Sequence, residues 1–181
     1  MYGLVNKAIK HFVIKNHDKK TWSKIVSKAS LDDDMFLAME SYDDAITYDL
    51  VHAASSHLNI EASEILIAFG KYWIEFAEKQ GYGAMLDLAG DNLVDFTKNL
   101  DLMHTHIAQS YQKMKPPSFH CEELSPNSLK LIYSSERAGL QPFVKGLIYG
   151  LGKRFKLDLE IEDQPLPPNS HEFIVSYNHQ S

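Results

Sequence analysis

The sequence predicts an α+β fold, with a mostly helical first part and a second part in which helices accompany a four-stranded antiparallel sheet. Up to about residue 115, apolar residues recur at three- and four-residue steps, the spacing of amphipathic helices. After Pro116-Pro117 the spacing changes to alternation in four short segments, which is typical of half-buried strands. The change in period therefore divides the chain into two structural regimes.

The composition indicates an ordinary soluble protein. A chain of 181 residues can form one domain with a full core, and we expect a single domain over residues 1–181. Its net charge of −6 offers no basic surface for nucleic acid. No apolar run approaches the roughly 18–20 residues that cross a bilayer, and no signal peptide is evident, so a cytoplasmic protein without membrane contact is expected. The single cysteine, Cys121, excludes an internal disulfide and a cysteine-rich zinc site.

The helical pattern predicts the elements of the first part. We expect helices at residues 3–15, from residue 18 or 21 onward, at 43–58 and at 64–77, a turn or two at 84–88, and a longer helix after Gly90. That last helix carries His104 and must stop before Pro116, because proline cannot continue a helix. Gly70 lies inside the most apolar helix, which suggests that a neighbouring helix or a flat ligand approaches its backbone.

The second part predicts two hairpins around one helix. Residues 118–122 and 129–133 form the first hairpin, with a turn at 125–128. Pro142 suits the first turn of a helix that ends near Phe155. The segments around 157–161 and 173–177 alternate apolar and polar residues, and they form the second antiparallel pair across a proline-rich link.

His104 is the first candidate site residue. It lies at the edge of the apolar stripe formed by Phe96, Leu100, Met103 and Ile107. A buried imidazole without a partner costs about 1–3 kcal/mol, so this side chain must either form an internal hydrogen bond or bind a metal. Spacing alone leaves both interpretations open. His106 is two positions away and faces a different side of the helix.

Tyr133, Ser135 and Arg137 form the second candidate group. They occupy alternate positions, which point the same way in an extended segment. Two hydroxyl donors and a guanidinium on one side can bind a carboxylate or phosphate, because arginine pairs with such groups through two hydrogen bonds. The alternative is an arginine in a surface ion pair beside two incidental hydroxyls.

Together these features resemble the H-NOX family, the heme-binding nitric oxide and oxygen sensor domains related to the sensor region of soluble guanylate cyclase, in its stand-alone bacterial type. The resemblance covers the whole chain. It includes the start Met1-Tyr2-Gly3-Leu4-Val5, the helix around Gly70, the His104 helix, the Pro116-Pro117 pair, the Tyr133, Ser135 and Arg137 motif, and the segment 146–150.

The resemblance implies a heme between two lobes, at about residues 1–60 and 61–181. His104 would be the proximal iron ligand of heme b (Fe-protoporphyrin IX). Tyr133, Ser135 and Arg137 would hold the heme propionates, whose negative charges need such donors inside a protein. Pro117 would press on the porphyrin and distort it. His120 and Cys121 match no family ligand position.

The resemblance also bears on which gas binds. Family members that hold oxygen stably use a tyrosine three residues before the glycine of the Gly-Leu-Ile segment, and here that position is Phe143. The other pocket residues are expected to be Val5, Ile9, Trp73 and Leu147. Without a hydroxyl donor, bound oxygen loses its hydrogen bond. We therefore expect a sensor of nitric oxide that also binds carbon monoxide and forms no stable oxygen complex.

The resemblance also implies the signal: binding of nitric oxide to the ferrous heme would release His104 from the iron. No output module is evident, and the resemblance to stand-alone members of the family implies a separate partner, either a histidine kinase or a cyclic-di-GMP enzyme. The domain itself is not expected to be an enzyme.

Two other classes remain open. One is a heme enzyme or redox sensor, with peroxidase-like turnover or a thiol switch at Cys121, although the pocket residues supply no acid or base for peroxide chemistry. The other is a heme-free interaction domain of the same fold.

Overall fold

The computed structural model describes residues 1–110 and 113–180. The chain forms two compact units, Met1–Phe69 and Gly70–Ser181. The boundary falls inside one long helix, α4 (Ala62–Ala77), whose first half belongs to the first unit. The sequence placed the boundary between two lobes near residue 60, whereas the compact units divide after Phe69. The two lobes therefore stay a prediction.

The first unit is helical, as predicted. Its elements are α1 (Gly3–Asn16), α2 (Lys19–Lys28), α3 (Asp44–Leu58) and the start of α4. Carboxylates begin two of these helices: Asp18 accepts a hydrogen bond from the Thr21 N–H at 2.6 Å, and Asp43 accepts one from the Ala45 N–H at 2.9 Å. A buried polar pair links α1 to α3, where the Thr47 hydroxyl donates to Asn6 Oδ1 at 2.7 Å.

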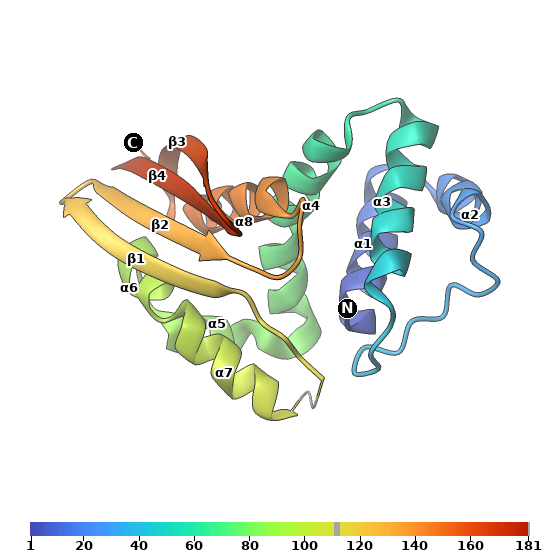
Figure 1. The fold of residues 1–181 in the computed structure, drawn as a ribbon, viewed down its shortest axis with the longest axis horizontal. Helices are drawn as coiled ribbons and strands as arrows, with labels where there is room; N and C mark the ends of the chain where they lie inside the picture. The colour runs from blue at the N-terminus through green and yellow to red at the C-terminus, as the bar shows by residue number, and fades with distance from the viewer. Residues whose placement is uncertain (111–112, 181) are drawn as a thin grey trace. The chain divides into compact units, whose positions relative to one another are not determined.

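The second unit contains the remaining helices and all the strands (Figure 1). Its helices after α4 are a π-helical turn η1 (Glu78–Tyr82), α5 (Gly83–Ala89), α6 (Leu93–Lys98), α7 (Leu100–Ser110) and α8 (Gln141–Phe155). Its strands are β1 (Ser118–Ser125), β2 (Ser128–Ser134), β3 (Leu157–Leu166) and β4 (Ser170–His179). The strands form one antiparallel sheet in the order β1-β2-β4-β3, which confirms the predicted four-stranded sheet.

The prediction of one long helix carrying His104 is wrong in one respect. The chain forms two helices, α6 and α7, with a break at Asn99. The side chain of Asn92 begins α6 by accepting from the Asp95 N–H at 2.9 Å. Asn99 leaves helical geometry, and its side-chain amide donates to the Ala89 carbonyl at 2.9 Å. The Asn99 side chain thus ties the junction of α6 and α7 to the end of α5. The predicted end of this helix includes residues 111–112, which lie outside the described part of the chain.

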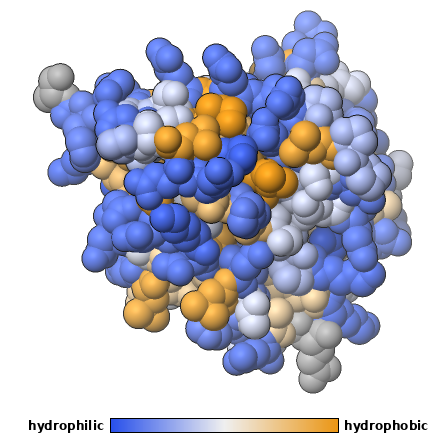
Figure 2. All heavy atoms as spheres, turned by 60° about the vertical axis from the view of Figure 1, so that its left-hand side comes forward, coloured by the Kyte–Doolittle hydropathy of each residue, from blue (hydrophilic) through white to orange (hydrophobic). Residues whose placement is uncertain are grey.

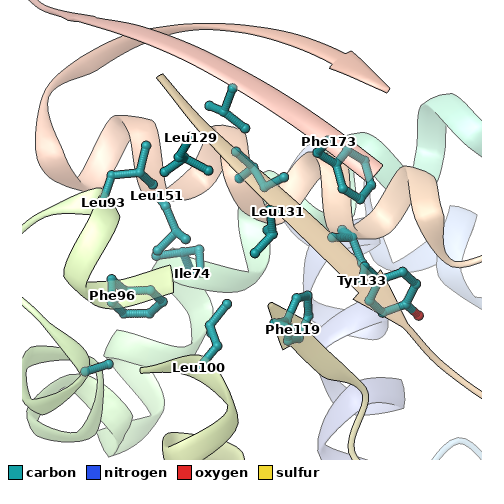
Figure 3. Packing of buried hydrophobic residues seen from close by; sticks show 14 of the residues in the cluster. Ile74, Leu93, Phe96, Leu100, Phe119, Leu129, Leu131, Tyr133, Leu151 and Phe173 are labelled. Atoms are coloured by element: carbon teal, nitrogen blue, oxygen red, sulfur yellow. The ribbon is translucent and has the colours of Figure 1, made fainter. Parts of the chain in front are cut away.

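The core of the second unit lies between the helices and one face of the sheet (Figure 3). Leu93 and Phe96 of α6 face Leu129 and Leu131 of β2, and all four are almost completely buried. Charged and polar side chains cover most of the face shown in Figure 2, where the apolar residues form small separate groups. None of the helices within residues 1–110 and 113–180 is both long and apolar enough to cross a bilayer.

The close approach predicted at Gly70 is made by α8. A Cβ added at Gly70 would lie 2.3 Å from the Phe143 carbonyl oxygen and 2.8 Å from the Gly146 Cα. One turn further along α8, a Cβ at Gly150 would lie 2.8 Å from the Ile74 side chain. Glycines on both helices therefore let α4 and α8 pack backbone against backbone, and a neighbouring helix explains Gly70 without a ligand.

This packing predicts that Gly70→Ala destabilises the protein by about 1–3 kcal/mol, because the added methyl group meets backbone that cannot move aside. Gly83→Ala is the matched control, since its Cβ would come no closer than 3.8 Å to a neighbour. The control should be neutral or up to about 1 kcal/mol more stable. Urea unfolding followed by circular dichroism measures both variants, and equal stability of Gly70→Ala and wild type would contradict the packing.

Candidate functional site

The site in the second unit begins with α7, which carries His104. The Asp101 carboxylate, one turn before His104, accepts a hydrogen bond from the Phe119 N–H at 2.7 Å and another from the Ser118 hydroxyl at 2.9 Å. Both donors lie at the start of β1. The two oxygens of one carboxylate thus hold the His104 helix to the edge of the sheet.

The His104 ring lies against the ring of Phe119, with centroids 5.7 Å apart and planes inclined by 26°. Its Nδ1 is buried and has no hydrogen-bond partner among residues 1–110 and 113–180. Burial lowers the pKa of the imidazole, and the nearby Asp101 carboxylate opposes that shift. His104 is therefore a neutral imidazole with a nitrogen that no described protein group uses, which is the form in which histidine binds metals.

Phe119 also connects His104 to the polar motif. Its ring lies 5.5 Å from that of Tyr133, which is buried on β2. Figure 3 shows the Tyr133 hydroxyl pointing away from the apolar cluster. Burial raises the pKa of this phenol, while its hydrogen bond with Ser135 and the charge of Arg137 act in the opposite direction. The phenol remains a hydrogen-bond donor at neutral pH.

Ser135 and Arg137 follow the end of β2, so the interpretation of 133–137 as one extended segment is wrong beyond Ser134. The chain bends instead, and the Ser135 hydroxyl accepts from the Arg137 N–H at 3.1 Å. The Arg137 guanidinium then donates to the Lys115 carbonyl at 2.8 Å. This contact ties the polar motif to the residues just before Pro117, which is half-buried.

Phe143, Trp73 and Leu147 lie on α8 and α4 within the second unit. The Trp73 and Phe143 rings meet edge to face with centroids 6.1 Å apart, and both side chains are half-buried, as is Leu147. The other two predicted pocket residues, Val5 and Ile9, lie on α1 of the first unit, where Ile9 is buried and Val5 half-buried. Their membership of a common pocket stays a prediction.

The other potential ligands lie elsewhere on the second unit. Cys121 is half-buried on β1, and its sulfur lies 3.2 Å from the Thr97 hydroxyl. His120 and His106 are exposed. Within the described residues, no three or more His, Cys, Asp or Glu side chains are arranged to hold a metal ion. A heme iron needs no such cluster, because the porphyrin supplies its equatorial ligands and the protein can supply a single axial one.

Comparison with known proteins identifies the family. A family model described as Haem-NO-binding matches residues 2–163. The chain belongs to the Haem-NO-binding, or H-NOX, family. Soluble guanylate cyclase gcy-32 of Caenorhabditis elegans is 30% identical over 165 residues, which cover 89% of this chain and 24% of that protein. The soluble guanylate cyclase β-2 subunit of Rattus norvegicus is 43% identical over 91 residues, half of this chain and 13% of that protein. The H-NOX chain thus spans about a quarter or less of these relatives.

Solved structures agree on the fold. An H-NOX protein from S. oneidensis in the Fe(II)NO state superimposes with a TM-score of 0.88 at 18% identity, covering 99% of this chain and all of that one. The unliganded Fe(II) H-NOX protein from K. algicida gives a TM-score of 0.86 at 20% identity, covering 99% and 98%. This chain therefore has the H-NOX fold, and members of the family bind heme and gases such as nitric oxide.

The residues of this H-NOX chain fit a heme. His104 offers a neutral imidazole whose buried Nδ1 has no partner in the described chain. Tyr133 and Ser135 offer hydroxyl donors, and Arg137 offers a cation, at the end of the same strand. Such a donor set suits anionic groups, as heme propionates are.

Two residues that matter here were missed from the sequence. Phe119 and Asp101 connect the histidine to the sheet, and neither belongs to a recognisable chemical motif. Asp101 reads as an ordinary exposed residue of a helical first turn, and only the strand that follows Pro117 supplies its two donors. The alternation of apolar and polar residues in β1 predicts that Phe119 is buried. It does not predict that Phe119 contacts His104.

The lowered pKa of His104 predicts a pH dependence of stability in the heme-free protein. The unfolded imidazole, with a pKa of about 6.5, binds a proton at a higher pH than the buried one does. Its contribution is therefore fully present above about pH 6.5 and falls as the pH drops toward the lower folded value, by at most about 1.4 kcal/mol per pH unit. In urea titrations, the unfolding free energy of wild type should fall relative to that of His104→Leu as the pH drops over this range. A difference independent of pH would contradict the burial of a neutral His104.

Proposed function

We propose that this H-NOX domain senses nitric oxide through a b-type heme whose iron is bound by His104, and signals to a separate partner protein when that bond breaks. Tyr133, Ser135 and Arg137 would hold the propionates, and Pro117 would press on the porphyrin. Val5, Ile9, Trp73, Phe143 and Leu147 would line the pocket. When bound, the heme would supply a ferrous iron that takes diatomic gases.

The observation that carries the proposal is the state of His104. A buried neutral imidazole without a partner costs about 1–3 kcal/mol, and an iron ligand removes that cost. The apolar Phe119 ring against it offers no competing hydrogen bond. In a family that binds heme, this histidine is the best ligand among the described residues.

The choice of gas rests on Phe143. At this position oxygen-binding family members have a tyrosine hydroxyl, and Phe143 instead presents a ring that packs edge to face on Trp73. Bound oxygen carries partial negative charge and needs a donor, whereas nitric oxide and carbon monoxide need much less. The Trp73 indole N–H is the alternative donor, and its packing against Phe143 and Phe76 favours a structural role.

Signal transmission would begin at α7. After release of His104 from iron, the Asp101 hydrogen bonds, the Phe119 contact and the apolar packing of Leu100 and Met103 would still hold this helix. The helix could then take a second position, which is a two-state element biased by a ligand. The partner would be a histidine kinase or a cyclic-di-GMP enzyme. The guanylate cyclase relatives, in which the matching segment is about a quarter of the protein, support a regulatory role.

A heme enzyme is the less favoured alternative. The proposed pocket residues are all apolar or aromatic and supply no acid or base for peroxide cleavage. A thiol switch at Cys121 would need a reactive thiolate, and this half-buried sulfur has a neutral hydroxyl beside it. A heme-free domain predicts a colourless purified protein.

Optical spectra test the gas selectivity. The reduced protein should bind nitric oxide and carbon monoxide, and in air it should give no stable oxygen complex. Phe143→Tyr should lengthen the lifetime of the oxygen complex by about tenfold or more, since one hydrogen bond to a charged group contributes about 1.5–3 kcal/mol. Trp73→Phe is the control for the indole donor and should leave wild-type behaviour unchanged. A stable oxygen complex in the wild-type protein would overturn the proposed selectivity.

Replacement of the ligand tests the signalling step. His104→Gly purified with free imidazole should retain heme, because imidazole occupies the place of the side chain. Nitric oxide should then displace the imidazole without moving α7, and partner activity should no longer respond to the gas. His106→Gly, on the exposed side of the same helix, serves as the control and should respond as wild type does. Normal regulation in His104→Gly would refute transmission through this residue.

A further inference from the structure

The segment between α2 and α3 presents three large apolar side chains to solvent. Met35 is 75% exposed, Leu37 64% and Met39 63%. They alternate with Phe36 and Ala38, which are half-buried against the first unit. Residues 35–37 alternate as an extended segment does, and residues 38–39 form a turn that the Glu40 N–H closes by donating to the Leu37 carbonyl at 3.0 Å. We name the outward residues Met35, Leu37 and Met39 the methionine strip.

The methionine strip is held in place by specific contacts. The Glu40 carbonyl accepts from the Gly3 N–H at 2.8 Å, and the Ala38 carbonyl accepts from the Leu4 N–H at 3.1 Å. The Leu37 N–H donates to the Tyr42 hydroxyl at 3.0 Å, and the Tyr42 ring meets that of Phe36 edge to face at 5.5 Å. The N-terminus of α1 thus anchors the segment, and the apolar side chains face outward as part of the fold. Exposed apolar side chains in such a group are characteristic of interaction surfaces.

The charged residues of the chain segment that carries the methionine strip are all acidic. Residues 31–51 contain no Lys, Arg or His, and their acidic residues are Asp32, Asp33, Asp34, Glu40, Asp43, Asp44 and Asp49. Two of the seven have cationic partners within the unit, since Asp34 pairs with Lys10 and Asp44 with the N-terminal amine. The exposed carboxylates on either side of the strip, at 32–33 and at 40, leave a negative rim around an apolar centre.

We propose that the methionine strip binds a basic amphipathic helix of a partner protein. Methionine and leucine side chains adapt to the apolar face of a helix, whose anchors recur every three or four residues. Lysine and arginine residues beside that face would meet the carboxylates at 32–33 and 40. The apolar contact supplies the affinity, and the complementary charge supplies orientation and a faster association rate.

Other occupants fit less well. A second copy of this chain would bring two acidic rims together, and its own basic amphipathic helix, α2, already buries Trp22 and Ile25 in the first unit. An anionic membrane surface or a nucleic acid would be repelled by the same carboxylates. The inference does not rest on gas sensing, because the first unit alone supplies every residue of the surface.

The test uses the full heme-loaded chain and a synthetic peptide of about 18 residues, or five helical turns, with leucines on one helical face and lysines on the other. Calorimetry should show saturable binding of one peptide per chain, and amide NMR shifts should concentrate in residues 31–44. A peptide with glutamate in place of lysine should bind at least about tenfold more weakly, because its charge opposes the acidic rim.

Variants distinguish specific binding at the methionine strip from nonspecific hydrophobic binding. Leu37→Ser should weaken peptide binding by about tenfold, as the loss of a central apolar anchor does. Leu88→Ser is the matched control, because Leu88 is 87% exposed on α5 of the second unit, and it should bind as wild type does. Asp32→Asn with Asp33→Asn should reduce the salt dependence of binding. All variants should keep the wild-type heme spectrum, so a failure here is distinct from failure of the gas-sensing proposal.

Several results would overturn the inference. These are no peptide binding, equal weakening by Leu37→Ser and Leu88→Ser, or equal binding of the glutamate peptide. Concentration-dependent dimerisation abolished by Leu37→Ser would assign the strip to a second copy of the chain. Binding to phosphatidylserine vesicles that Leu37→Ser abolishes would assign it to a membrane.

Discussion

The arrangement of the site depends on the two hydrogen bonds that the Asp101 carboxylate accepts from the first two residues of β1. They attach α7 to β1 at a point one turn before His104. The histidine ring therefore lies against Phe119 at the edge of the sheet. Phe119 in turn packs on Tyr133, the first residue of the polar motif. One carboxylate therefore orders a row of three rings that ends in the hydroxyl and guanidinium donors.

The same arrangement suits His104 for the iron bond that breaks in the proposed mechanism. Neither Phe119 nor Asp101 pairs with the buried nitrogen of His104. Phe119 is apolar, and the two oxygens of Asp101 accept hydrogen bonds from β1. An imidazole held by packing has a fixed direction and no second partner to stabilise it when released. In the proposed mechanism, release from iron leaves the imidazole without a partner, and this unfavourable state drives α7 to a new position.

The sequence predicted the fold class and the order of elements because period 3.6 and period 2 are properties of single segments. Gly70, Pro116-Pro117 and Pro142 acted as local signals, and each lies where the structure has a close helix approach, a helix-to-strand change or a helix start. The break at Asn99 escaped prediction because no proline or glycine marks it, and the side-chain contact of Asn99 is with the Ala89 carbonyl ten residues earlier. The bend after Ser134 escaped for a similar reason, since Arg137 is directed by the carbonyl of Lys115.

The candidate site shows the same limit. Types and spacing singled out His104, Tyr133, Ser135 and Arg137, whereas Phe119 and Asp101 became visible only when a distant strand was placed beside the helix. Membership of the H-NOX family supports the common role proposed for these residues, and the chain's own contacts give them their geometry. The methionine strip carries no motif either, and only its exposure in the structure distinguishes it from a buried apolar segment.

The central claim is that His104 is bound to iron in the ferrous protein and released by nitric oxide. Resonance Raman spectra of the ferrous protein, compared with protein in which histidine is labelled with nitrogen-15, test it most directly. The account predicts a low-frequency iron–histidine band that shifts with the label, disappears with nitric oxide, and is absent in His104→Gly. A label-sensitive band that persists in the presence of nitric oxide, or that remains in His104→Gly, would contradict it.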